Sequence, residues 1–190
     1  GEILVKRQIS WQDVTYEQCQ QICKQIIKAI APKLQNEILL SSNRYRHLLQ
    51  RIEQLSIDSL MRLVEFAKHS EFSPKALEQD FGANSSMPPL LFTNEDNHKI
   101  EIIGQIDRID FNDNYYLVID YKSGNAFINL LQVYYGLKLQ LLTYLLVAQN
   151  TTLQLYNMEN AIPAGILYCF LKTPVITGTN KLSVQQIKTE

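Results

Sequence analysis

Residues 104–124 read GQIDRIDFNDNYYLVIDYKSG and decide the fold of this chain. Residues 99–111 and 115–121 are rich in Ile, Val and Tyr and alternate well enough to be two strands. Residues 112–114, which lie between them, are Asn, Asp and Asn, and these residue types tolerate the positive φ of a tight turn. The sequence therefore predicts an antiparallel hairpin.

The turn also predicts the register of this hairpin. If residues 113 and 114 form the turn, Asp107 lies opposite Asp120 and Gln105 opposite Lys122. Because strand side chains alternate between faces, Asp120 and Lys122 share a face. We therefore expect two carboxylates and a lysine to converge on one patch, whereas a register one residue different would put Asp107 on the other face.

Such a patch suits a divalent cation. Carboxylates opposed across two strands repel each other, and a bound cation neutralises that repulsion. Oxygen ligands favour Mg²⁺ or Mn²⁺ over zinc, and the ion would bind a scissile phosphate and lower the pKa of an attacking water. Lys122 would orient that water or neutralise the charge of the transition state. The alternative is a surface hairpin with solvated charges, because Asp-x-Lys is a common tripeptide.

The first part of the chain is expected to be helical. Thr15 followed by Gln18 is the pattern of a capping box, and the apolar stripe after it has helical spacing up to Pro32. A second amphipathic helix is predicted over residues 43–68, before Ser-Pro at 73–74.

The remaining elements suggest a mixed α/β fold. Residues 76–81 are compatible with a short strand, and residues 82–89 form a loop rich in Asn, Ser and Pro. We divide the chain into a helical N-terminal part, residues 1–72, and a core, residues 73–190, with a central mixed sheet flanked by helices.

Composition is that of an ordinary globular protein, with 46% hydrophobic and 19% charged residues. The formal net charge is −1, so any contact with DNA has to come from a local cleft or from a partner chain. No apolar run is long enough for a membrane span, and we expect no membrane association.

The three cysteines, Cys19, Cys23 and Cys169, indicate a reducing compartment, the cytoplasm, because they are sparse and odd in number. Cys19 and Cys23 are four residues apart on one predicted helix face, a spacing that also suits a metal pair. Ile22 and Ile26 continue the same stripe, so we favour a role in the core.

Three motifs carry a family resemblance: GQIDRID at 104–110, VIDYKSG at 118–124 and GLKLQLLTYL at 136–145. Together they resemble the nuclease domains of the RecB-like branch of the PD-(D/E)XK superfamily. More narrowly, they look like the B subunits of bacterial AddAB or RexAB helicase–nucleases. The resemblance covers residues 43–174 and implies a restriction-endonuclease-like core.

The resemblance implies roles for five residues. Asp107 and Asp120 would be the carboxylates that bind Mg²⁺ or Mn²⁺, and Lys122 the catalytic lysine. Gln140 and Tyr144 share a helix face that this family turns toward the active site, although packing within a Leu-rich helix is an alternative.

Other residues receive supporting roles. Arg108 and Asp110 belong to the motif but point to the other face in the predicted register, so we interpret them as an ion pair. Glu78 is either an additional metal ligand or a structural residue of an edge strand, and we favour the structural role. The histidines are expected at the surface or at helix ends: His47, His69 and His98.

The chain also departs from the family. Relatives usually carry a histidine on a helix before the carboxylate motifs, and no clear histidine motif precedes Asn43. Many B subunits bind an iron–sulfur cluster through four cysteines, but the cysteines here do not have that spacing and do not support a cluster. The strand-like beginning at Glu2 fits a piece of a longer chain. We therefore expect the isolated chain to bind DNA weakly and to cut it poorly.

The sequence contains no G-x-x-x-x-G-K-[ST], so it has no ATP site of the P-loop type. By resemblance, an AddA- or RexA-like helicase A subunit would be the motor of a heterodimer. This chain would then be a DNA exonuclease that cuts a single strand emerging from unwinding during recombinational repair of double-strand breaks. An inactive nuclease-fold module that guides DNA and a stand-alone nuclease of the same superfamily stay open as alternatives.

Overall fold

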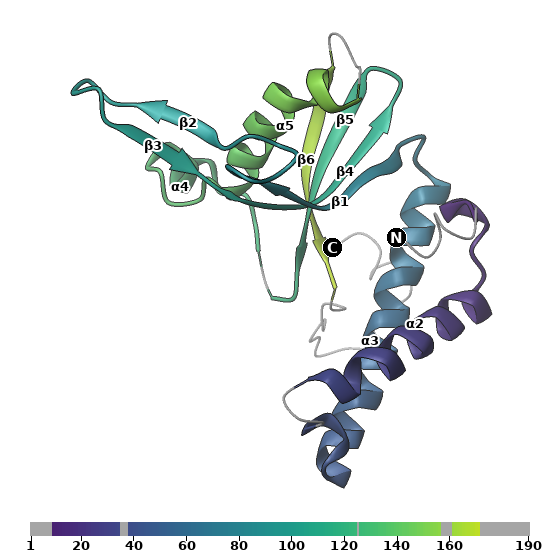
Figure 1. Cartoon of the computed structure of the whole chain (residues 1–190). Coiled ribbons are helices and arrows are strands. Elements are labelled where there is room, and N and C mark those ends of the chain that lie inside the picture. The colour runs from purple at the N-terminus through teal and green to yellow at the C-terminus, as the bar shows by residue number, and fades with distance from the viewer. Residues whose placement is uncertain (1–8, 35–37, 125, 157–160, 172–190) are drawn as a thin grey trace, which may run out of the picture.

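The fold is centred on a four-stranded mixed sheet. The computed structural model describes residues 9–34, 38–124, 126–156 and 161–171, with the backbone alone for 152–156. The strand order is β1-β4-β5-β6, in which β5 and β6 are parallel and the other two neighbouring pairs are antiparallel. The strands are β1 (Ser73–Phe81), β4 (Gly104–Asn112), β5 (Tyr115–Lys122) and β6 (Ile162–Phe170). This is the predicted mixed α/β architecture (Figure 1).

Two long helices, α2 (Tyr16–Ile30) and α3 (Asn43–Lys68), confirm the helical prediction. The capping box is present, because the Gln18 N–H donates to Thr15 Oγ1 at 3.3 Å and the Thr15 N–H to Gln18 Oε1 at 2.9 Å. The helices pack through a small core, and short 3-10 turns flank them: η1 (Trp11–Asp13), η2 (Ala31–Lys33) and η3 (Ile38–Leu40). Among the described helices, none has the length and apolarity needed to cross a membrane.

The sheet has a different cover on each face. Helix α5 (Gln140–Tyr156), preceded by the short α4 (Leu130–Tyr134), packs on one face. Val147 and Ala148 of α5 join the main core with Ile109 and Val118. Helices α2 and α3 lie below the sheet and beside the end of β6 (Figure 1). The Ser59 hydroxyl fixes this arrangement by donating to the Leu171 carbonyl at 2.8 Å.

Cys19 and Cys23 are buried in the α2–α3 layer, as the core interpretation predicts. Burial raises the pKa of both thiols, and their mutual proximity adds to the rise for Cys19. The histidines His47, His69 and His98 are exposed, and His69 is the C-cap of α3.

The prediction of one strand over residues 99–111 is wrong. The strand is interrupted at Ile103. Before it, β3 (Lys99–Ile102) pairs with β2 (Leu90–Thr93) in a separate two-stranded sheet. Gly104 begins β4 next to the Phe81 ring, and a Cβ at this position would lie 2.9 Å from Phe81 Cζ. Alternation of side chains cannot reveal this break, because both halves alternate while their pairing partners differ.

Strand β1 begins at Ser73, three residues before the predicted start, and includes Pro74. An edge strand tolerates proline because one of its sides needs no ladder hydrogen bond. A bulge between Pro74 and Ala76 shifts the register there.

The predicted hairpin register is confirmed over the ladder that forms. Asn112 pairs with Tyr115 and Arg108 with Ile119, and Asp113 occupies the turn with a φ of 47°.

Arg108 and Asp110 form the ion pair that the sequence predicts, and both side chains are fully buried. Arg108 Nε lies 2.6 Å from Asp110 Oδ1 and Nη2 lies 2.5 Å from Oδ2, a bidentate geometry. The Trp11 ring covers the guanidinium at 5.0 Å and Tyr121 Oη lies 3.4 Å from Nη1. The pair therefore ties β4 to β5 and to the N-terminal segment.

Arg108→Met should lower the free energy of unfolding by about 3–5 kcal/mol, because it leaves the Asp110 carboxylate buried without its partner. Arg108→Met combined with Asp110→Leu should recover most of this loss, since no unpaired charge remains. Urea denaturation of the parent and both variants measures the difference. A double variant as unstable as the single one would contradict this account.

Candidate active site

Asp107 lies where the β4–β5 ladder ends. The ladder stops at the pair Arg108–Ile119, so Asp107 and Asp120 are not ladder partners as the register alone predicts. Instead the Asp107 carboxylate accepts a hydrogen bond from the backbone N–H of Tyr121 at 2.7 Å. This bond holds Asp107 at the end of the hairpin, next to the strand residue that follows Asp120.

Asp120 is a buried carboxylate in contact with a lysine. Its side chain is 2% exposed, and Oδ2 contacts the Lys122 ammonium. Burial raises the pKa of the Asp120 carboxyl, the Lys122 ammonium opposes this rise, and the charge of Asp107 adds to it. The hydrogen bond from the Tyr121 N–H places the Asp107 carboxylate next to the Asp120 position of β5.

A chain of hydrogen bonds links β5 to α5. Lys122 Nζ donates to Gln140 Oε1 at 2.9 Å, and Gln140 Nε2 donates to the Tyr144 hydroxyl at 2.9 Å. The Tyr144 ring packs edge-on against Phe81, with 6.1 Å between ring centroids. The structure thus brings the five residues singled out in the sequence to one end of the sheet, with Tyr144 anchored in the core.

Tyr168 also reaches this end of the sheet. Lys122 Nζ lies 5.4 Å from the centre of the Tyr168 ring, because the parallel pairing of β5 and β6 places Tyr168 beside Asp120. Sequence patterns do not specify which strand pairs in parallel with β5, so the position of Tyr168 was not predictable.

Glu78 is closer to the site than its interpretation as a structural residue suggests. The β1–β4 register pairs its neighbours Leu77 and Gln79 with Arg108 and Ile106, so Glu78 lies level with Asp107. The φ of Glu78, 49°, is rare for a residue with a side chain. Partial desolvation, Asp107 and Asp80 raise the pKa of Glu78, although its side chain is largely exposed. Backbone strain of this kind often marks a functional position.

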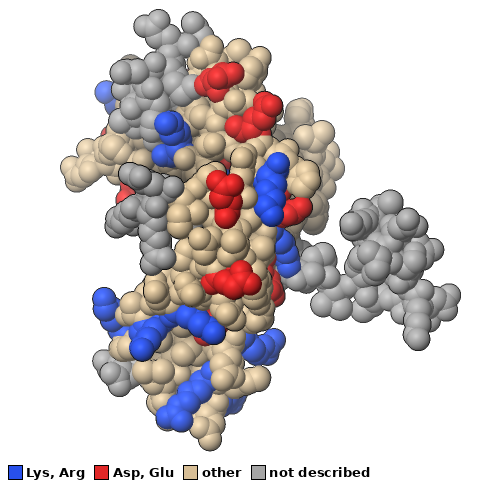
Figure 2. Space-filling view, turned by 90° about the vertical axis from the view of Figure 1, so that its right-hand side faces the viewer, with Lys and Arg blue, Asp and Glu red and all other residues tan. Residues whose placement is uncertain are grey.

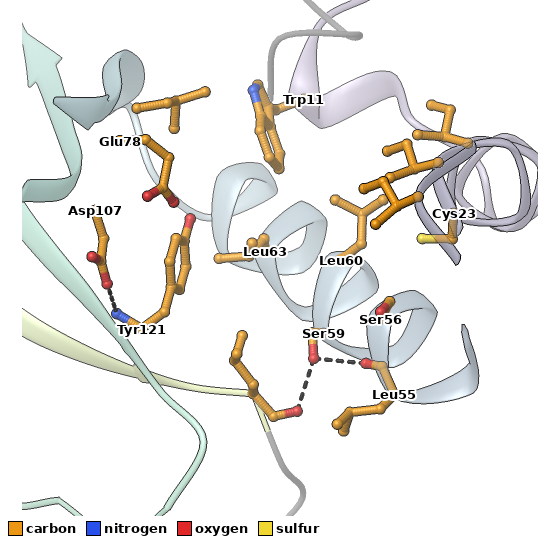
Figure 3. A pocket seen from close by; sticks show the side chains of 15 residues that line it. Trp11, Cys23, Leu55, Ser56, Ser59, Leu60, Leu63, Glu78, Asp107 and Tyr121 are labelled. Atoms are coloured by element: carbon orange, nitrogen blue, oxygen red, sulfur yellow. Dashed lines mark hydrogen bonds between the residues drawn. The ribbon is translucent and has the colours of Figure 1, made fainter. Parts of the chain in front are cut away.

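A cavity of about 830 Å³ opens beside these carboxylates, between the sheet and the helices. Figure 3 shows Glu78, Asp107 and Tyr121 on its sheet side and Leu60 and Leu63 of α3 facing them. Glu78 and Asp107 are therefore accessible from an open, mainly apolar hollow, whereas Asp120 is buried.

The family model of the PD-(D/E)XK nuclease superfamily matches residues 4–189. The chain belongs to the PD-(D/E)XK nuclease superfamily. It is also 37% identical over 194 residues to the B subunits of the ATP-dependent helicase/deoxyribonucleases of Bacillus cereus (strain G9842), Bacillus thuringiensis (strain Al Hakam) and Bacillus anthracis. The match covers 98% of this chain and 17% of the length of each relative.

PD-(D/E)XK nucleases generally use divalent metals, and the donors present here fit such an ion. Asp107 is the neighbour of both Glu78 and Asp120, so each of these two supplies carboxylate oxygens beside it, and Asp120 Oδ2 is buried with a cation as its contact. Within the described residues, no group of three or more His, Cys, Asp or Glu side chains is already arranged around a common centre. The fit therefore rests on oxygen chemistry and proximity.

The raised pKa of Asp120 predicts how stability changes with pH in the metal-free protein. The folded state holds the Asp120 proton more tightly than the unfolded state does, so protonation of Asp120 stabilises the fold. This contribution to the free energy of unfolding is complete below the ordinary aspartate pKa of about 4. It is lost as pH rises through the raised pKa of the folded state. Asp120→Asn should remove this decline.

Urea unfolding in EDTA between acid and neutral pH measures the effect. Asp80→Asn is the matched control, because Asp80 is exposed and bonded to Gln105 at 3.0 Å. The control should keep the decline. A decline of parental size in Asp120→Asn would contradict the assignment.

Proposed function

We propose that this chain is the metal-dependent deoxyribonuclease part of a helicase–nuclease B subunit and hydrolyses phosphodiester bonds of DNA. The observation that carries the proposal is the contact chain Asp120–Lys122–Gln140–Tyr144 beside Asp107. It joins two separate family motifs in one polar network beside Asp107, which lines an accessible cavity.

Asp107 and Asp120 would hold the metal, with Glu78 as a third carboxylate. A bound Mg²⁺ or Mn²⁺ would polarise the scissile phosphate and lower the pKa of the attacking water. We assign the metal as Mg²⁺, with Mn²⁺ as a substitute, because both prefer oxygen donors.

Lys122 acts as a cation in this scheme. Burial lowers the pKa of Lys122, but the contact with Asp120 together with the charges of Tyr168 and Asp107 raises it overall, so the ammonium stays protonated at neutral pH. A protonated lysine neutralises charge that develops on the phosphate and does not remove a proton from water.

Gln140 and Tyr144 are positioning residues. The Tyr144 hydroxyl accepts from the Gln140 amide nitrogen, which turns the amide oxygen toward Lys122. Lys122 is thereby held at a defined place between β5 and α5.

We further propose that the two parts, residues 1–72 and 73–190, work as one nuclease domain in a cytoplasmic B subunit. The partner would be a helicase A subunit that supplies unwound single strands at double-strand breaks, where this chain acts as an exonuclease. The shared name of the relatives, which describes each as the B subunit of an ATP-dependent helicase/deoxyribonuclease, supports this assignment.

Mn²⁺ should raise the melting temperature of the chain, because it binds the folded state. At a hundredfold excess over Kd, binding adds about 2.7 kcal/mol to the free energy of unfolding. Asp107→Asn and Asp120→Asn should abolish the shift. Glu78→Gln should weaken Mn²⁺ binding several-fold, while Asp80→Asn leaves it unchanged. Thermal melts and titration calorimetry give the comparison, and equal binding by parent and Asp120→Asn would reject the metal site.

Asp120→Ala or Lys122→Ala in the helicase–nuclease assembly should slow cutting of one DNA strand on the order of a hundredfold or more. Unwinding driven by ATP should persist, because the motor has its own site. Gel analysis of end-labelled DNA separates cutting from unwinding. Cleavage of both strands at the parental rate in Asp120→Ala would favour an inactive, DNA-guiding module instead.

A further inference from the structure

Positive charge is concentrated at one end of the α2–α3 pair. Residues 24–51 contain six basic residues and one acidic residue, Glu37, a net charge of +5 in a chain whose total is −1. Figure 2 shows basic side chains gathered at the lower end of the molecule, with most acidic side chains above them. We call this set the basic end: Lys24, Lys28, Lys33, Arg44, Arg46 and Arg51.

Among the described residues, most of this charge has no acidic partner. All six side chains are exposed, and Lys24 alone has a carboxylate partner within the described residues, Glu53 at 3.9 Å. Arg46 Nη1 lies 3.4 Å from Asn43 Oδ1, which is a neutral group. Such a surface attracts a polyanion.

Part of the basic end is shaped as a hollow. Arg44, His47 and Arg51 lie on one face of α3 and line a depression of about 410 Å³ with Tyr45 and Leu48. Guanidinium groups bind phosphate oxygens in a bidentate manner, and hydroxyl groups also contact phosphates.

Helix α3 leads from this hollow to the carboxylates. Leu63 of α3 lines the same cavity as Asp107. At 1.5 Å per residue, Arg51 lies about 18 Å and Arg44 about 28 Å from Leu63 along the helix axis. A stacked strand that advances about 3.4 Å per nucleotide covers this distance with about five to eight nucleotides.

We infer that the basic end is the surface on which the phosphate backbone of a DNA strand docks while another part of the strand lies at Asp107. This inference rests on the proposed function. The clustered carboxylates repel phosphates, so an anionic substrate needs an anchor elsewhere on the chain. An acidic protein surface fits the same charge but does not explain why α3 leads from the hollow to the site, so we favour DNA.

The test compares two variants with the same loss of charge. Arg44→Gln/Arg51→Gln removes two charges from the basic end, and Lys75→Gln/Lys99→Gln removes two exposed charges elsewhere. Fluorescence anisotropy of labelled dT20 in EDTA reports binding without cleavage. The first variant should bind roughly tenfold or more weakly at 0.1 M salt, with a salt dependence smaller by about 1.4 in log–log slope. The control should bind almost as the parent does.

Equal losses in both variants would mean that net charge alone acts, and unchanged binding in the first variant would likewise overturn the inference. If the first variant keeps DNA binding but loses binding to the helicase subunit, the basic end is a protein interface. Circular dichroism checks that α3 is intact. Asp120→Ala keeps all six cations of the basic end and removes one repelling carboxylate, so it should bind dT20 at least as tightly as the parent; loss of cleavage in this variant then concerns the nuclease site and not the basic end.

Discussion

The hydrogen bond from the Tyr121 N–H to the Asp107 carboxylate is the constraint on which the site depends. A carbonyl oxygen of β4 would accept this bond if the ladder continued, and the strands would stay paired. Because a side chain takes that place, the hairpin opens at Asp107 and the carboxylate stays next to Asp120. The adjoining residue, Arg108, turns to the opposite face and is fixed there by Asp110. Alternation of side chains along β4 thus puts Asp107, which would bind metal, and Arg108, which secures the strand, on opposite faces.

The same arrangement costs stability. Asp120 is buried and close to Asp107, and Glu78 adds a third carboxylate at a strained backbone position. Lys122 offsets part of this repulsion through its contact with Asp120. The fold tolerates the rest because the core beneath α5 and the buried Arg108–Asp110 pair stabilise the same strands. Local strain and repulsion with support from the surrounding core are common at functional sites.

A net charge near zero hides how charge is distributed over this molecule. The basic end lies on the helical layer and the carboxylates lie on the sheet, and the cavity that both α3 and Asp107 line is between the two layers. The chain spans 17% of the length of its helicase/deoxyribonuclease relatives, so further contacts to DNA would come from the rest of such a protein.

Local pattern in the sequence determined the helices α2 and α3, the hairpin turn at Asp113 and the register up to Arg108, because capping, periodicity and turn preferences act over a few residues. The motif residues Asp107, Asp120 and Lys122 were also identifiable from the sequence. Tertiary structure alone decided the break at Ile103, the end of the ladder, the approach of Glu78 to Asp107 and the gathering of cations at one end of two helices. These depend on which strand or helix lies beside which, and that choice is made by contacts between residues far apart in the chain.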